Sequence, residues 1–262
     1  MSILQWDHTV HYVNDLEQAI TAFKNNGLTA FPGGSHKLWG THNALSYFGL
    51  NYIEFLAIED RELAESSDTA NLVVKDAVNL LPEVEAFSRV AIRTDNIEET
   101  AASLKQQGLK LSPIMYGKRL NVQGQWIEWR MLTVGGNFQG LIYPFFIQWK
   151  GSDDERLAEL KETGIITPHP AGEITVQQAI FSVSDPAATA AHWGQVFGLS
   201  AIAASSPSPS DGQGSVALAI GDKNFVFQQG DKQQLTQLVL SSESPSLQGR
   251  TIIIGEGEYV FT

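Results

Sequence analysis

Hydrophobic and polar residues follow one pattern that recurs three times along the chain. Each copy starts with a short apolar run suited to a β-strand. It then passes an acidic residue, continues with apolar residues at helical spacing and closes on a glycine. The copies span residues 6–28, 87–109 and 176–199, with Asp15, Asp95 and Asp185 as the acidic residues and Gly27, Gly108 and Gly198 as the glycines. The pattern predicts three strand–helix units, in which the aspartate caps the helix and the glycine ends it.

Further strand-like runs follow each predicted helix, such as ALSYFG at 44–49 and NYIEFLAI at 51–58. A strand, a helix and then several strands make a βαβββ module, so the sequence predicts an α+β fold built from repeated modules. We expect paired modules within 1–150, at 1–60 and 86–150, with a helical connection at 61–85. A linker at 151–173 and a third βαβββ-like module at 174–262 complete the expected organisation.

The third module lacks an obvious partner in the sequence. A βαβββ unit has a sheet edge and a concave face, and exposed edges tend to pair with other strands. We therefore expect the third module either to pack on the first two or to pair with its counterpart across a homodimer two-fold axis.

Composition limits the classes of function. The net charge of −12 argues against a nucleic-acid or anionic-membrane surface. The chain contains no cysteine, which excludes disulfides, thiolate metal sites and a cysteine nucleophile. No apolar stretch approaches the roughly 20 residues that cross a bilayer, and the first residues do not resemble a signal peptide. We expect a cytoplasmic protein that binds a small molecule, not nucleic acid or a membrane.

The copies differ at two positions where metal-ligand residue types could stand. Seven residues before the acidic residue the chain has His8, Ser88 and Gln178. Near the end of a later strand it has Glu54, Gln148 and Gln228, the last of these aligned to within a residue or two. Only the first copy therefore combines an imidazole with a carboxylate. A carboxylate on a strongly apolar strand is costly unless it is paired, metal-bound or facing a wet cavity, which makes Glu54 the leading functional candidate.

These residues resemble the vicinal oxygen chelate superfamily, which includes glyoxalase I, extradiol dioxygenases and several antibiotic-resistance proteins. The stretch 33–58 is similar to glyoxalase-like proteins that carry H-x-x-x-G-T-x-N, here beginning at His36, followed by Y-[IL]-E, here ending at Glu54. FFIQW at 145–149 and HPAG at 169–172 also resemble that group. The resemblance implies that two modules form a cupped mixed β-sheet, with ligands converging on a divalent metal inside it.

The resemblance also assigns possible metal ligands. His8 and Glu54 match the first-module ligands, and Gln148 matches the fourth-strand position of the second module, where related sequences often have Glu. Ser88 is a poor ligand, so this set is incomplete. The implied metal would be zinc, nickel, iron or manganese, and His36 or His42 could supply a missing imidazole.

Other residues are candidates for substrate contact, and each has a structural alternative. His36, Thr41, His42 and Asn43 could contact a ligand or could shape a tight loop. Arg130 could face an anionic substrate or form a surface ion pair, and His169 could contact a ligand or belong to a turn. His11 differs from His8 by an odd number of residues, so it should face the opposite side of the strand and be structural. The tryptophans of 126–149 are expected in the core.

Two classes of function are compatible with this pattern. In the first, the protein is a metal-dependent glyoxalase-like lyase or isomerase, or a dioxygenase, with Glu54 as a metal ligand or a base. In the second, it is a non-catalytic small-molecule binding or resistance protein that keeps the cavity and has lost the metal. A shared fold does not decide between them.

Overall fold

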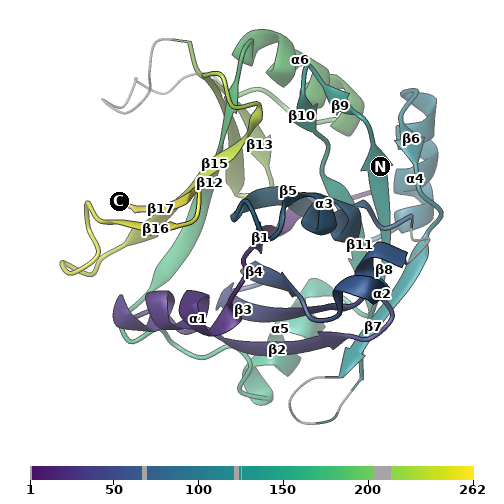
Figure 1. The fold of residues 1–262 in the computed structure, drawn as a ribbon. Helices are drawn as coiled ribbons and strands as arrows, with labels where there is room; N and C mark the ends of the chain where they lie inside the picture. The colour runs from purple at the N-terminus through teal and green to yellow at the C-terminus, as the bar shows by residue number, and fades with distance from the viewer. Residues whose placement is uncertain (1, 67–69, 121–123, 125, 203–213) are drawn as a thin grey trace.

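The computed structural model describes residues 2–66, 70–120, 124, 126–202 and 214–262. Two β-sheets dominate the described chain (Figure 1). The N-terminal sheet has the strand order β2-β3-β4-β1-β5-β11-β8-β6, and β7 also pairs with β8. Its strands are β1 (Leu4–Tyr12), β2 (Phe31–His36), β3 (Thr41–Phe48), β4 (Asn51–Ile58), β5 (Ala86–Thr94), β6 (Lys110–Leu111), β7 (Met115–Leu120), β8 (Trp126–Gly135) and β11 (Phe145–Trp149).

The C-terminal sheet has the order β13-β14-β12-β15-β17-β16. Its strands are β12 (Ile174–Val183), β13 (Val216–Ile220), β14 (Lys223–Gln229), β15 (Gln234–Ser242), β16 (Thr251–Ile254) and β17 (Gly257–Phe261). The short strands β9 (Asn137–Phe138) and β10 (Leu141–Ile142) form a separate hairpin. The helices are α1 (Leu16–Asn25), α2 (Arg61–Ser66), α3 (Leu72–Leu80), α4 (Ile97–Gln106), α5 (Asp153–Glu162) and α6 (Pro186–Phe197).

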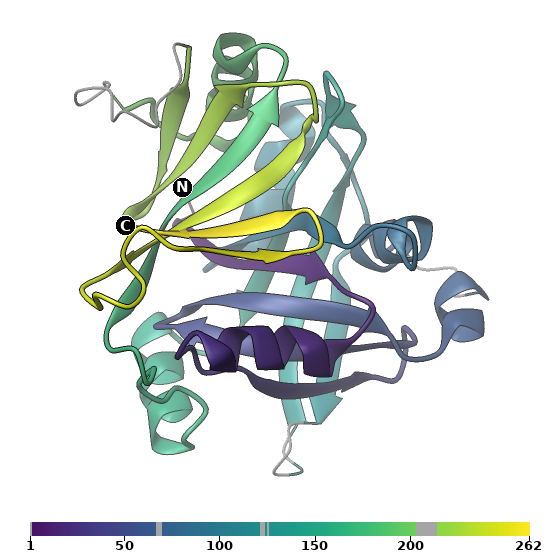
Figure 2. The same ribbon diagram turned by 60° about the vertical axis from the view of Figure 1, so that its left-hand side comes forward.

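The predicted α+β architecture of βαβββ modules in cupped sheets is confirmed. In the first module, β1 runs parallel to β4, and in the second, β5 runs parallel to β11. The two modules join through β1 and β5, which are antiparallel. A continuous sheet therefore curves from β2 to β6 (Figures 1 and 2).

The three repeat helices start and end largely as the sequence pattern predicts. The side chain of Asp15 accepts from the backbone at the start of α1, and Asp185 does the same for α6. The second repeat differs, because Asn96 caps α4 and Asp95 instead accepts from the backbone N–H of Ile3. The expectation that Asp95 caps its helix is therefore wrong by one residue.

The C-terminal sheet repeats the pairing pattern of the N-terminal sheet. Strand β12 is parallel to β14 and antiparallel to β15, which is in turn parallel to β17. Strands β15–β17 thus occupy the place of a second module that has no helix between its strands. The third module finds its pairing partner within its own chain.

The two sheets also pack against each other through one hydrophobic core. On the N-terminal side this core includes Phe55 and Phe87, and on the C-terminal side it includes Tyr259. The ring of Tyr259 lies 5.1 Å from that of Phe87 and 6.4 Å from that of Phe55. Packing within the chain was the first of the two arrangements expected for the third module, and the homodimer stays a prediction.

The connection at 61–85 folds into helices α2 and α3. Helix α3 lies over the concave face of the N-terminal sheet, where Val73 and Ala77 pack with Val10 and Leu56. A cavity lies between this helix and the strands. Among the described helices, none is long and apolar enough to span a membrane.

Candidate functional site

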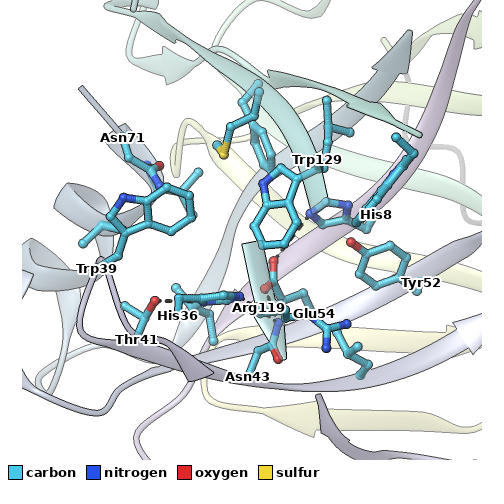
Figure 3. Close-up of a pocket in the computed structure, with 18 residues that line it drawn as sticks. His8, His36, Trp39, Thr41, Asn43, Tyr52, Glu54, Asn71, Arg119 and Trp129 are labelled. Carbon is cyan, nitrogen blue, oxygen red and sulfur yellow. Dashed lines mark hydrogen bonds and ion pairs between the residues drawn. The ribbon is translucent and has the colours of Figure 1, made fainter. Parts of the chain in front are cut away.

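The concave face of the N-terminal sheet holds a cavity between the strands and α3 (Figure 3). Its polar side is formed by His8, His36, Thr41, Asn43, Glu54 and Arg119, and its walls include Trp39, Tyr52, Trp129, Met131, Phe145 and Trp149. The cavity has a volume of about 50 Å³. A space of that size suits a small molecule or several waters.

His8 reaches this cavity next to an acidic residue that the sequence reasoning missed. The β1–β5 ladder shifts register between Trp6 and His8, which leaves Asp7 as the extra residue of a bulge. Both Asp7 and His8 are buried, and Asp7 Oδ1 lies 2.6 Å from His8 Nδ1. A bulge suspends the alternation of side chains along a strand, so neighbouring residues can act on one site.

Asp7 is held by groups that come from distant parts of the chain. Its Oδ2 accepts hydrogen bonds from Trp149 Nε1 at 3.0 Å and from Arg156 Nη1 at 3.1 Å. Arg156 lies on α5 and also stacks on the ring of Trp149. Burial opposes ionisation of Asp7, but the charge of Arg156 and the hydrogen bond with His8 lower its pKa. The linker at 151–173 therefore contributes directly to this polar centre.

Glu54 lies on the other side of His8. Its Oε2 is 3.5 Å from His8 Nε2, and its Oε1 accepts from Asn43 Nδ2 at 2.6 Å. Burial opposes the charge of Glu54, but the contact with His8 outweighs it and lowers the pKa to about 2. Burial likewise disfavours protonated His8, yet Asp7 and Glu54 together raise the pKa of its imidazole. The two carboxylates thus favour the protonated form of the imidazole between them.

The motif that begins at His36 folds onto the same cavity. His36 Nδ1 lies 3.0 Å from Thr41 Oγ1, and burial lowers the pKa of His36 to about 4. Its other nitrogen lies 3.5 Å from Asn43 Nδ2. The side chain of Asn43 has room because residue 33 is a glycine, since a Cβ at Gly33 would lie only 2.3 Å from Asn43 Oδ1. These residues line the cavity as well as shaping the β2–β3 connection, so the two readings of the motif are compatible.

Aromatic side chains form much of the remaining wall. Tyr52 stacks on the imidazole of His8 with ring centres 4.4 Å apart, and Phe145 meets the same imidazole edge-on at 5.4 Å. Trp129 also lines the cavity and lies above Glu54 in the view of Figure 3. Two of the tryptophans expected in the core therefore border the cavity, Trp129 and Trp149, whereas Trp126 is exposed.

The structure does not bring Gln148 or Arg130 to this cavity. Phe145 and Ile147 face it from β11, so Gln148, one residue out of phase, points away. Its Oε1 accepts from the backbone of Ile97 at 3.0 Å and from Arg130 at 2.6 Å. Arg130 also pairs with Glu98, which is the surface ion pair considered as its alternative.

His42 and His169 also lie outside the cavity. His42 stands between Thr41 and Asn43 on β3, and alternation turns it to the opposite face. His169 accepts from the backbone N–H of Thr29 at 2.9 Å and stacks on Phe48, so it fastens the linker to the first module. His11 is buried on the convex face against Tyr259, as its spacing from His8 predicts.

Strand registers identify the second-module counterparts of the two central residues. Helix caps Asp15 and Asn96 align β1 with β5 so that His8 corresponds to Arg89. In the first module, Glu54 pairs with the residue two after His8. The residue two after Arg89 is Ala91, which pairs with Phe145. The second module thus offers an arginine and a phenylalanine where the first offers a histidine and a glutamate.

These residues do not fit the metal centre that the superfamily resemblance implies. Among the described residues, no group of three or more His, Cys, Asp or Glu side chains is placed to hold a metal ion. His8, His36 and Glu54 are the possible donors that line the cavity, and the flanking carboxylates favour the protonated form of His8, which cannot coordinate a metal. A divalent cation would therefore need to displace the proton of His8 and to complete its shell with water.

The curved sheet of paired βαβββ modules, with a polar cavity on its concave face, defines a protein of the vicinal oxygen chelate fold. A family model described as a glyoxalase-like domain matches residues 6–197, and the chain belongs to this family.

Solved structures resemble the chain to different extents. A hypothetical protein from Staphylococcus aureus is 21% identical over 99% of each chain, with a TM-score of 0.84. Methylmalonyl-CoA epimerase from Mycobacterium tuberculosis is 17% identical, covering 59% of this chain and 91% of that one, with a TM-score of 0.41. The Streptomyces coelicolor methylmalonyl-CoA epimerase is 15% identical, covering 57% and 100%, with a TM-score of 0.40. No curated protein matches the chain.

Proposed function

We propose that this protein binds a small oxygenated molecule in the concave cavity of its N-terminal sheet, with Glu54 as the principal acceptor. The observation that carries the proposal is the buried, ionised carboxylate of Glu54, which borders the cavity. A carboxylate has about four acceptor positions, and among the described residues Glu54 contacts His8 and Asn43 through its oxygens. A hydroxyl or amide N–H of a ligand can use the remaining capacity.

Binding has better support than proton abstraction by Glu54. A general base is most effective when its pKa lies near the working pH, and the pKa of Glu54 is about 2. His8, whose pKa is raised, is better suited to donate a proton than to accept one. The Asp7–His8–Glu54 chain therefore supports one catalytic alternative, in which His8 acts as a general acid on the bound molecule.

Metal-dependent lyase, isomerase or dioxygenase chemistry has less support from the donor set. The second-module positions hold Arg89 and Phe145, neither of which is a metal ligand at neutral pH. We therefore expect substoichiometric metal by elemental analysis of protein purified without added metal or chelator. The proposal would be contradicted if the parent protein contained a full equivalent of a divalent metal and Glu54→Gln contained none.

The direct test compares Glu54→Gln with the parent protein. Ligand-observed NMR against a panel of small alcohols, amides and hydroxy acids identifies molecules that bind. We expect Glu54→Gln to weaken binding of hydroxylated ligands about tenfold, because a charge-assisted hydrogen bond is lost. Glu128→Gln, at an exposed carboxylate on β8, is the matched control and should bind like the parent. Equal binding by Glu54→Gln and the parent would refute the role of Glu54.

A further inference from the structure

Arg119 is a buried cation at the cavity that the sequence analysis did not single out. It lies on β7, its side chain borders the cavity, and its residue is 9% exposed (Figure 3). Its Nη1 donates to the backbone carbonyl of Gly33. Among the described residues, no carboxylate forms an ion pair with it. Buried charges are normally paired because desolvation of an isolated ion is costly, so this guanidinium requires an explanation.

The two buried carboxylates of the site are already engaged by other cations. Asp7 is contacted by His8 and Arg156, and Glu54 is contacted by His8 and Asn43. Glu54 is the acidic side chain among the residues that line the cavity, whereas Arg119 is a permanent cation and His8 has a raised pKa that favours its charged form. A ligand with a negative charge would supply the ion-pair partner that Arg119 lacks among the described residues.

We propose that the small molecule bound here is a carboxylic acid that also carries a hydroxyl group, with its carboxylate on Arg119 and its hydroxyl on Glu54. This inference rests on the proposed binding function and deepens it. A guanidinium has five N–H donors, and a carboxylate accepts two of them in parallel. The apolar part of the acid would lie against the aromatic wall that includes Trp39, Trp129 and Phe145.

The charge and the hydroxyl can be tested separately with three probes of nearly equal size. 2-Hydroxybutyrate has both groups, 2-hydroxybutyramide lacks the charge, and butyrate lacks the hydroxyl. Calorimetric titration of the full chain should show that 2-hydroxybutyrate binds about tenfold or more tightly than either of the others. Arg119→Gln should abolish the preference for the acid over its amide. Arg119→Lys should keep part of this preference, because it preserves the charge but not the planar fork.

Two controls keep the inference distinguishable from the proposed function. Arg130→Gln removes a nearby arginine outside the cavity and should bind all three probes like the parent. Glu54→Gln should remove the preference for 2-hydroxybutyrate over butyrate while retaining the preference for the acid over its amide. If Glu54→Gln keeps the preference for 2-hydroxybutyrate over butyrate and all other results are as expected, the role of Glu54 is wrong and the role of Arg119 stands.

The inference is overturned if the acid and its amide bind the parent equally, or if the acid does not bind at all. It is also overturned if Arg119→Gln keeps the full preference for the acid. Circular dichroism and thermal unfolding establish that the variants are folded. If Arg119→Gln is unfolded, the Arg119→Lys variant decides, since unchanged acid and amide affinities there would contradict bidentate recognition.

Discussion

The two sheets of this protein share a strand pattern but differ in what their corresponding faces carry. Helix caps Asp15 and Asp185 align β1 with β12, so His8 corresponds to Gln178. The parallel partners align in the same way, and Glu54 then corresponds to Val226. The N-terminal sheet thus has an imidazole and a carboxylate where the C-terminal sheet has an amide and an isopropyl group. One backbone pattern thus supports a buried polar centre in the first sheet, whereas the corresponding face of the second sheet carries the partly exposed Gln178.

The same bulge occurs in both sheets and serves different ends. The register of β12 against β15 shifts between Val176 and Gln178, as that of β1 against β5 shifts around Asp7. The bulge residue Gln177 is exposed, whereas Asp7 is fully buried. The difference follows from the covering elements, because α5 brings Arg156 to Asp7. A site here depends on the segments that close a face as much as on the strands that form it.

The largest effect in this comparison is expected from Asp7→Asn. The change leaves Arg156 and His8 without their shared buried carboxylate, and breaking a buried ion pair costs about 3–5 kcal/mol of unfolding free energy. Urea unfolding measures the difference. NMR titration of the variant should also show a lower pKa for His8, because Asp7 contributes to raising it.

The matched change in the second sheet is Gln177→Ala at the corresponding bulge. Its side chain is exposed and, among the described residues, bonds only to Thr175, so we expect a change within about 0.5 kcal/mol. Comparable destabilisation by both variants would mean that the bulge geometry, and not the buried charge, accounts for the effect of Asp7→Asn.

The sequence predicted the repeated architecture because its strand–helix pattern depends on local residues. Helical spacing, caps and closing glycines are encoded within each repeat, and His8 with Glu54 stands out as a polar pair on apolar strands. One error arose where strand alternation was not applied. Gln148 was placed in the cavity by its position near the end of a strand, but alternation assigns that face to Phe145 and Ile147.

Other parts of the site depend on contacts that sequence spacing does not reveal. Asp7 follows Trp6 on an apolar strand, and its charge was a usable signal, but regular alternation would turn it away from His8. The bulge cancels that alternation. Arg156 lies 149 residues from Asp7, and Arg119 lies 86 residues from Gly33. Such contacts form only in the folded chain, where the sheet curves and the linker packs on it, so sequence spacing does not reveal them.

A second prediction concerns the contact between the sheets. Burial lowers the pKa of His11 to about 3, below its ordinary value of 6.5, so the folded protein holds this imidazole neutral. The unfolded chain takes up a proton near pH 6.5, and the folded chain does not until about pH 3. The resulting stability is present above pH 6.5 and is lost as the pH falls through this window.

The test compares the parent with His11→Phe between pH 6.5 and 4.5. We expect the parent to lose about 2 kcal/mol more unfolding free energy over this interval than the variant, which has no titrating group there. Loss of the hydrogen bond between His11 and Tyr259 shifts the variant equally at all pH values. Parallel pH profiles for the two proteins would show that His11 does not set the acid sensitivity.

The smallest effect tests the alignment on which the comparison of modules depends. Asn96 accepts from the backbone N–H of Glu99 at the start of α4, so Asn96→Ala should cost about 1 kcal/mol of unfolding free energy, as should Asp185→Ala at α6. Asp95→Ala removes an exposed hydrogen bond to Ile3 and should cost only a few tenths of a kcal/mol. Urea unfolding of the three variants measures the order. A larger loss for Asp95→Ala would restore that residue as the cap and move the counterpart of His8 from Arg89 back to Ser88. Ser88 donates to Tyr12 and lies outside the lining of the cavity, so even then the second module would not supply a strong metal ligand.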